Sequence, residues 1–303
     1  MNIIPLNYGA VEITDFDITD FSLEKALAVK KVLTEELVVV IRNQNYDPFY
    51  FAQLIYHIGG ICNWIQCERD IDGNLITDRP SYPDFKNWDR SKPFPMQRVT
   101  GEKRDGKFTG IFPLGKLDWH CNLNGPDRAD GVALQGIKGV KNTRTSWNNT
   151  ALALKDMPED LLSRIKGKYA KFFYNPTNWA DIDYDEQLKY MLQRQHHYKM
   201  WLEQTNVAGI KGLYLYTKND CEIVGDDKNL FNDLQDFLFQ EKYLYHHDWD
   251  VGDIVLSDQL LTLHKRRQEV DQVFENRLLN RITFRITNTG KPPVLIERNN
   301  IPD

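Results

Sequence analysis

The sequence predicts a mainly β protein with helical additions, either a β-barrel or a jelly roll. Many short stretches rich in β-branched and aromatic residues alternate with a few helical ones, and no repeat or low-complexity linker divides them. The chain has 303 residues, of which 41% are hydrophobic and 27% charged, as in an ordinary globular protein. We therefore expect residues 1–303 to form a single domain.

The N-terminal elements have clear boundaries. Apolar residues at helical spacing predict a helix over 22–36, and the β-branched run that follows predicts a buried strand over 36–41. Asp47 and Pro48 supply the N-cap and the first-turn proline of a second helix, which should end at Gly59-Gly60.

A long polar stretch over 69–112 is rich in Pro, Gly and Asp. Its length is typical of an active-site loop, although surface decoration is an equally good interpretation. Within it, Arg104-Asp-Gly106 predicts a hairpin. The remaining chain predicts strands over 117–122, 132–136, 143–147, 211–216, 253–256 and 281–288, and helices over 151–154, 158–165, 186–204 and 230–238.

Charge and cysteine content exclude several classes of protein. The net charge of −5 argues against a general nucleic-acid or membrane-surface binder, since both need a strong basic excess. The 4 cysteines form no C-x-x-C pair, so we expect reduced thiols rather than a zinc knuckle. The N-terminal residues lack the pattern of a signal peptide, and no apolar run is long enough to span a bilayer. We expect a cytoplasmic protein.

A candidate metal site begins at the predicted strand Leu117-Asp-Trp-His-Cys-Asn122. Alternate side chains of a strand share a face, so His120 and Asn122 should point the same way, as should Asp118. His264 is the candidate for a distant third ligand. Two histidines and one oxygen ligand on a single face leave open positions, which is typical of non-haem Fe(II) oxygenases. An H-x-N pair by itself also arises by chance.

Two arginines follow on the last predicted strand. Arg281 and Arg285 are separated by four residues and should face the same side, inward if the apolar residues between them face outward. A buried guanidinium needs an anionic partner, and its planar fork suits a carboxylate, as a dicarboxylate cosubstrate would supply. The alternative is two exposed arginines on an edge strand.

Other polar groups give weaker signals. His246-His247 should precede a strand, where adjacent side chains point to opposite faces and make a poor chelating pair. Lys265-Arg-Arg267 is typical of a solvated loop, or of a patch that attracts an anionic substrate.

The order of these motifs resembles the taurine dioxygenase-like family of Fe(II)- and 2-oxoglutarate-dependent oxygenases along nearly the whole chain. Trp119-His-Cys-Asn122 resembles the family's W-H-x-D metal motif, and Thr145-Ser-Trp147 its T-x-W segment. Trp249-Asp-Val-Gly-Asp253 followed by His264 is similar to its W-x-x-G-D strand and second metal histidine. Arg281-Ile-Thr-Phe-Arg285 resembles its paired arginines.

The resemblance implies a double-stranded β-helix, which is a jelly roll, and an enzyme that uses Fe(II), 2-oxoglutarate and O2 on a small-molecule substrate. It implies that His120, Asn122 and His264 hold the iron. Thr145 and Arg281 would then hold the distal carboxylate of 2-oxoglutarate, and Arg285 an acidic group of the substrate.

Asn122 departs from the family, which has a carboxylate at this position. An amide oxygen is neutral and is a weaker donor to Fe(II) than a carboxylate. Asn122 either coordinates weakly, or leaves a position open to halide as in the related halogenases, or marks a binding protein that performs no oxidation. Asp118 offers an alternative ligand from the same strand face. We favour weak coordination, because Thr145, Arg281 and Arg285 are all present.

Overall fold

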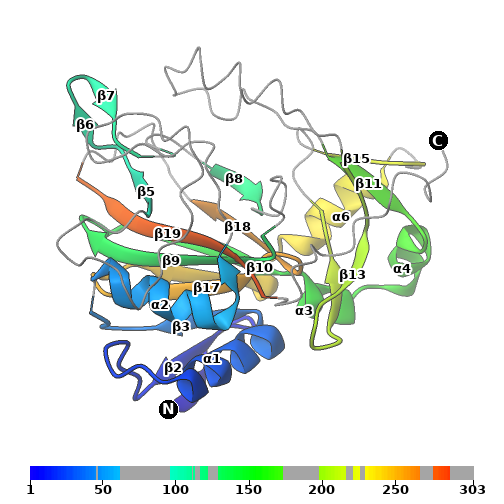
Figure 1. The fold of residues 1–303 in the computed structure, drawn as a ribbon. Coiled ribbons are helices and arrows are strands. Elements are labelled where there is room, and N and C mark those ends of the chain that lie inside the picture. Colours follow the sequence, from blue (N-terminus) through cyan, green and yellow to red (C-terminus); the bar gives the residue numbers. More distant parts are fainter. Residues whose placement is uncertain are drawn as a thin grey trace.

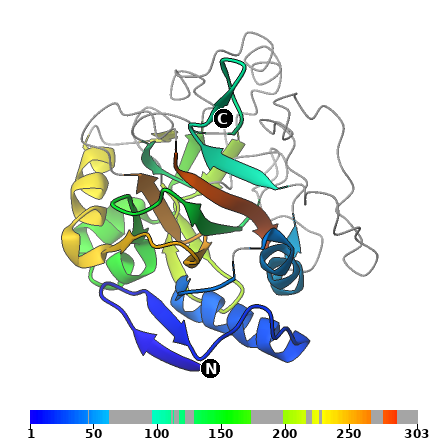
Figure 2. The same ribbon diagram turned by 90° about the vertical axis from the view of Figure 1, so that its left-hand side faces the viewer.

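The computed structural model describes residues 1–45, 47–61, 96–110, 112, 117–121, 129–172, 198–215, 221–225, 229–266 and 276–286. Within them the protein is a jelly roll of two facing sheets with helices packed outside (Figures 1 and 2). The predicted fold is confirmed. The expected insertion at 69–112 lies largely outside the described residues, and its role stays a prediction.

The larger sheet has eight strands and carries the N-terminal helices on its outer face (Figure 1). Its path runs β1-β2-β3-β17-β9-β19-β4, with β5 also paired to β19. In that order the strands are Asn2–Pro5, Val11–Thr14, Val38–Ile41, Ile254–Asp258, Gly131–Lys138, Leu278–Arg285 and Gly60–Ile61, and β5 is Gln97–Thr100. All pairs are antiparallel except β2 with β3.

The smaller sheet has four strands in the order β16-β10-β18-β8 and closes the other side of the barrel. These strands span Leu244–Asp248, Arg144–Asn149, Thr262–Arg266 and Leu117–His120. All three strand pairs are antiparallel. The inner face of this sheet meets the inner face of the larger sheet in a core that contains Trp147, Tyr245, Trp249, Leu134 and Leu279.

Helices α1 (Leu23–Glu36) and α2 (Pro48–Ile58) begin where the sequence predicts. The Ser22 side chain accepts a hydrogen bond from the Lys25 amide, and the Asp47 side chain accepts one from the Phe49 amide. Both helices bury their apolar faces against the outer face of the larger sheet. None of the helices in the described part of the chain is long and apolar enough to cross a membrane.

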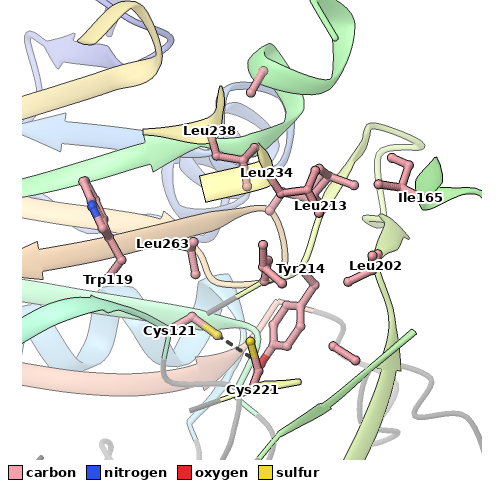
Figure 3. Close-up of a cluster of buried hydrophobic side chains, with 14 of the residues drawn as sticks. Trp119, Cys121, Ile165, Leu202, Leu213, Tyr214, Cys221, Leu234, Leu238 and Leu263 are labelled. Carbon is pink, nitrogen blue, oxygen red and sulfur yellow. Dashed lines mark hydrogen bonds between the residues drawn. The ribbon is translucent and has the colours of Figure 1, made fainter. Parts of the chain in front are cut away.

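A second apolar core covers the outer face of the smaller sheet (Figure 3). Trp119 of β8 and Cys121, which directly follows β8, lie in this core, and Cys121 donates a hydrogen bond to the Tyr214 hydroxyl over 3.1 Å. The core is completed by α3 (Thr150–Lys155), α4 (Glu159–Ile165), α6 (Leu230–Leu238), the 3-10 helix η2 (Glu241–Tyr243), and strands β11 (Tyr169–Phe172), β12 (Tyr198–Trp201), β14 (Lys211–Leu213) and β15 (Cys221–Ile223). Strand β13 (Glu203–Thr205) pairs with β14.

The predicted helix over 186–204 is wrong in its described part. Residues 198–205 form β12 and β13, which pair with β11 and β14 respectively. Met200 and Leu202 are buried whereas Trp201 and Glu203 are exposed, so the residues alternate as in a strand. Pairing with strands distant in sequence overrides the local helical preference. Residues 186–197 lie outside the described residues.

Two further expectations need correction. His246 and His247 lie within β16 rather than before a strand, although they do face opposite sides of it. Lys265 and Arg266 belong to β18 rather than to a solvated loop, and Arg266 is only 5% exposed. Position 267 is outside the described residues. By contrast, the predicted hairpin is present, with β6 (Lys103–Arg104) paired to β7 (Lys107–Phe108).

Candidate active site

The two predicted metal histidines lie side by side on the smaller sheet. His120 ends β8 and His264 lies within β18, and the two residues are direct partners across the strand pair. Their ring centroids are 4.2 Å apart. Trp119 and Cys121, the neighbours of His120, point to the opposite face and into the outer core, because adjacent side chains of an extended chain alternate between faces. The fold therefore brings together the two histidines that the sequence separates by 144 residues.

Both rings are held in the neutral form that binds a metal ion. Burial lowers the pKa of His120 to about 4; the Asp118 carbonyl opposes this effect, and the charges of Arg281 and Arg266 add to it. Burial, then the charges of His120 and Arg281, lower the pKa of His264 well below its ordinary value. Neutral imidazoles placed this close favour a shared cation.

The hydrogen bonds of the histidines also fit a metal ion. Nδ1 of His120 lies 2.6 Å from the backbone oxygen of Asp118, so Nδ1 carries the proton and the Nε2 lone pair is left for a metal. Nδ1 of His264 is buried and has no hydrogen-bond partner among the described residues. Because a buried nitrogen without a hydrogen-bond partner is rare, we expect Nδ1 of His264 to be bound by a group from outside the chain or by a residue outside the described part.

The third ligand is not placed. Asn122 lies in residues 122–128, outside the described part, so its coordination stays a prediction. Within the described ranges, no group of three His, Cys, Asp or Glu side chains could hold a metal ion. The alternative ligand Asp118 is exposed, and its contact with His120 is through the backbone carbonyl.

Two rows of side chains cross the inner face of the smaller sheet. The first row runs His120, His264, Trp147 and Tyr245, one residue from each strand in register. The second row, two residues along, runs Arg266, Thr145 and His247. Thr145 is therefore next to the histidine row, as the predicted cosubstrate role requires. Its hydroxyl accepts a hydrogen bond from the Trp249 indole over 2.9 Å.

The predicted arginines face the barrel interior. Arg281 and Arg285 share the face of β19 that carries Leu279 in the inner core, while Ile282 and Phe284 face the helices. Arg281 is 3% exposed, and its Nη1 donates to the side-chain oxygen of Gln97 on β5. Arg285 is half-buried at the end of the strand.

Two further arginines are buried at the same site: Arg266 was expected only in a solvated loop or an anion-attracting patch, and Arg277 was not singled out from the sequence. Arg266 lies opposite Thr145, and its Nη1 donates to the Phe112 carbonyl over 3.0 Å. Arg277 is 4% exposed, and burial followed by the charge of Arg266 lowers its pKa. A usable signal was present, because Arg277 and Arg281 have the same four-residue spacing as Arg281 and Arg285.

Known structures share this fold, and a family model matches the chain. Residues 3–283 match the model of the "Taurine catabolism dioxygenase TauD, TfdA family". The solved structure of AAD-2 with Mn(II) and N-oxalylglycine is 16% identical, with a TM-score of 0.67 over 97% of this chain and 99% of that one. A taurine dioxygenase from Burkholderia xenovorans is 16% identical, with a TM-score of 0.64 over 93% and 88%. Among curated proteins, no sequence relative matches the chain. The chain therefore belongs to the taurine catabolism dioxygenase TauD, TfdA family and is an Fe(II)- and 2-oxoglutarate-dependent dioxygenase.

Proposed function

We propose that the protein hydroxylates a small organic substrate that carries an anionic group. The observation that supports this proposal is the position of Arg281. Its buried charge lowers the pKa of both His120 and His264, so the guanidinium lies close to the histidine pair. A cation at this position attracts an anion to the metal site, and its fork can orient a carboxylate or sulfonate.

The chain's own residues prepare the site. His120 and His264 would hold the iron through neutral imidazoles, and the amide oxygen of Asn122 would complete the ligand set. Gln97 fixes the Arg281 guanidinium through the hydrogen bond from Nη1. Burial removes water from these groups and strengthens their electrostatic interactions. Bound iron, with 2-oxoglutarate and O2, supplies the oxidising chemistry.

Two assignments of the arginines compete. The sequence-based hypothesis gives the distal carboxylate of 2-oxoglutarate to Thr145 with Arg281, and the substrate anion to Arg285. The positions of Arg266 and Arg277 support a second arrangement, which we favour. Since Arg266 is opposite Thr145 and its charge acts on Arg277, these two arginines would hold the cosubstrate. Arg281, whose charge acts on both histidines, would then hold the substrate.

Alanine variants distinguish the two arrangements. Removing one partner of a buried charge pair costs about 3–5 kcal/mol, which weakens 2-oxoglutarate binding by roughly a hundredfold or more. In the second arrangement Arg277→Ala shows this loss and Arg281→Ala instead raises the KM of an anionic substrate. The sequence-based hypothesis instead expects Arg281→Ala to weaken 2-oxoglutarate binding and Arg285→Ala to raise the KM of the anionic substrate. Arg144→Ala removes a surface ion pair with Asp248 and serves as the matched control.

Substrate chemistry is tested by pairs of compounds. Succinate formation is measured with small carboxylates or sulfonates and with their neutral amides of equal size. The proposal expects the anionic member of each pair to stimulate turnover more strongly. Equal stimulation by both members would contradict an anionic substrate, because the guanidinium would then contribute nothing to recognition.

Halogenation is the second candidate function, and Asn122 is the observation that favours it. If the neutral side chain leaves a ligand position to chloride, chloride should be incorporated into the product and Asn122→Asp should end that reaction. If Asn122 is a weak ligand, succinate formation should not depend on chloride. A chain that forms no succinate under either condition would be a binding protein without oxidation.

A further inference from the structure

The strand that carries His120 lies at the edge of the smaller sheet and is paired irregularly with its neighbour. Among the described strands β8 pairs with β18 alone, through His120 with His264 and Leu117 with Arg266. Between these two pairs β8 has two residues and β18 has one, which is the pattern of a β-bulge. Because a bulge interrupts the ladder, the strand pairing by itself fixes His120 less firmly than a regular ladder would.

The bulge brings the His120 ring against the backbone of its own strand. Nδ1 of His120 lies 2.6 Å from the carbonyl oxygen of Asp118, which is the first of the two bulged residues. This contact keeps the ring proton on Nδ1 and leaves Nε2 for a metal ion. The orientation of the ring therefore depends on the conformation of residues 118–121, and a movement of this segment would also move the metal-binding nitrogen.

Two side chains hold this segment from the outer face of the sheet (Figure 3). Trp119 stacks on Phe239 with the ring centroids 4.9 Å apart. Cys121 is 1% exposed and donates a hydrogen bond to the Tyr214 hydroxyl over 3.1 Å, drawn as a dashed line in Figure 3. These residues come immediately before and after His120, so they anchor its backbone from both directions along the chain.

The Tyr214 side chain is itself firmly placed in the outer core. It is 1% exposed, and its ring meets the Phe172 ring edge-on with centroids 4.9 Å apart. Its backbone amide donates to the Leu202 carbonyl over 2.8 Å. Breaking a hydrogen bond buried this deeply is costly, because water cannot readily replace the lost partner. Cys121 and Tyr214 therefore form a fixed link between the outer core and the residue next to the metal histidine.

We propose that Cys121 and Tyr214 are positioning residues for the metal site, and that their hydrogen bond fixes the bulged end of β8 so that the His120 ring faces the metal ion. This inference rests on the iron-dependent oxygenase of the proposed function. Both side chains lie behind the sheet, on the face opposite the histidine pair, so they act through the position of His120. Partners that orient a metal ligand indirectly contribute about tenfold to a hundredfold to metal affinity, and we expect the lower end of this range.

The test compares Fe(II) affinity with stability in two matched tyrosine variants. Tyr214→Phe removes the hydroxyl that accepts from Cys121 and keeps the ring. Tyr243→Phe is the control, because Tyr243 is a buried tyrosine of the same outer core whose hydroxyl donates to Asp156 instead. In anaerobic titrations of the full-length proteins, Tyr214→Phe should weaken Fe(II) binding about tenfold and Tyr243→Phe should leave it unchanged. Urea unfolding of the metal-free proteins should show similar losses of stability in both variants.

Changes at Cys121 test the same bond from its donor side. Cys121→Ala removes the donor, whereas Cys121→Ser keeps a hydroxyl donor of similar size. We expect the alanine variant to lose as much Fe(II) affinity as Tyr214→Phe, and the serine variant to retain most of it. The double variant Cys121→Ala with Tyr214→Phe should bind Fe(II) no more weakly than either single variant, because each change alone already removes the bond.

The visible absorption of the Co(II)-loaded protein gives a second readout, because it reports the geometry of the ligands. It should change in Tyr214→Phe and Cys121→Ala and match the wild type in Tyr243→Phe. Wild-type affinity and spectrum in Tyr214→Phe and Cys121→Ala would overturn the positioning role, as would equal losses of affinity in the two tyrosine variants. A wild type that binds no Fe(II), or a His120→Ala variant that binds it normally, would instead reject the metal site and the proposed function.

Discussion

Asp258 should make the protein less stable as the pH rises. Its side chain is 2% exposed, and burial raises its pKa from 3.8 to about 7; a hydrogen bond from Asn206 opposes the shift and the charge of Asp130 adds to it. The folded state then holds the proton more tightly than the unfolded state. The stabilising effect is complete below about pH 4 and is lost as the pH rises to about 7. About three pKa units correspond to roughly 4 kcal/mol.

Asp258→Asn removes this titration. The unfolding free energy of the variant minus that of the wild type should therefore increase by roughly 3 kcal/mol between pH 5 and pH 8. Urea unfolding of the metal-free proteins, followed by tryptophan fluorescence, measures the difference at each pH. Asp258 Oδ2 accepts a hydrogen bond from the Asn206 side-chain nitrogen, and an amide nitrogen at that position would lose this bond. The resulting loss of stability does not vary with pH, so it leaves the pH dependence of the unfolding free energy unchanged. Asp248→Asn is the control, because Arg144 lowers the pKa of Asp248 below this range. Parallel pH curves for wild type and Asp258→Asn would refute the reasoning.

Three further predictions concern the metal site and the core. His120→Ala and His264→Ala should each abolish specific Fe(II) binding in a titration, and unchanged affinity in both would reject the site. Asn122→Asp should tighten Fe(II) binding, because a charged oxygen replaces a neutral one; equal affinity would show that this side chain never reaches the metal. Gly131→Ala should lower the free energy of unfolding by about 1–3 kcal/mol, since its Cβ would lie 2.5 Å from the Phe284 ring. An unchanged urea midpoint would contradict that contact.

The sequence alone determined the elements whose signals are local. The cap Asp47 and the first-turn Pro48 are read from neighbouring residues, and the β-branched run over 38–41 is buried on both faces as its composition requires. The positive φ of Asp105 and Gly106 at the hairpin turn also follows from residue type. The order of motifs along the chain was enough to indicate the family, because that order is itself a property of the sequence.

Only the tertiary structure decided which distant residues meet. Residues 198–205 form strands because β11 and β14 pair with them, and no local pattern encodes those partners. Arg266 is buried because β18 places it opposite Thr145, whereas its neighbours Lys265 and Arg267 suggested a solvated loop. The row from His120 to Tyr245 is likewise a consequence of strand register. A shift of one residue would turn every side chain of a strand to the other face, so the site depends on pairings that only the folded sheet fixes.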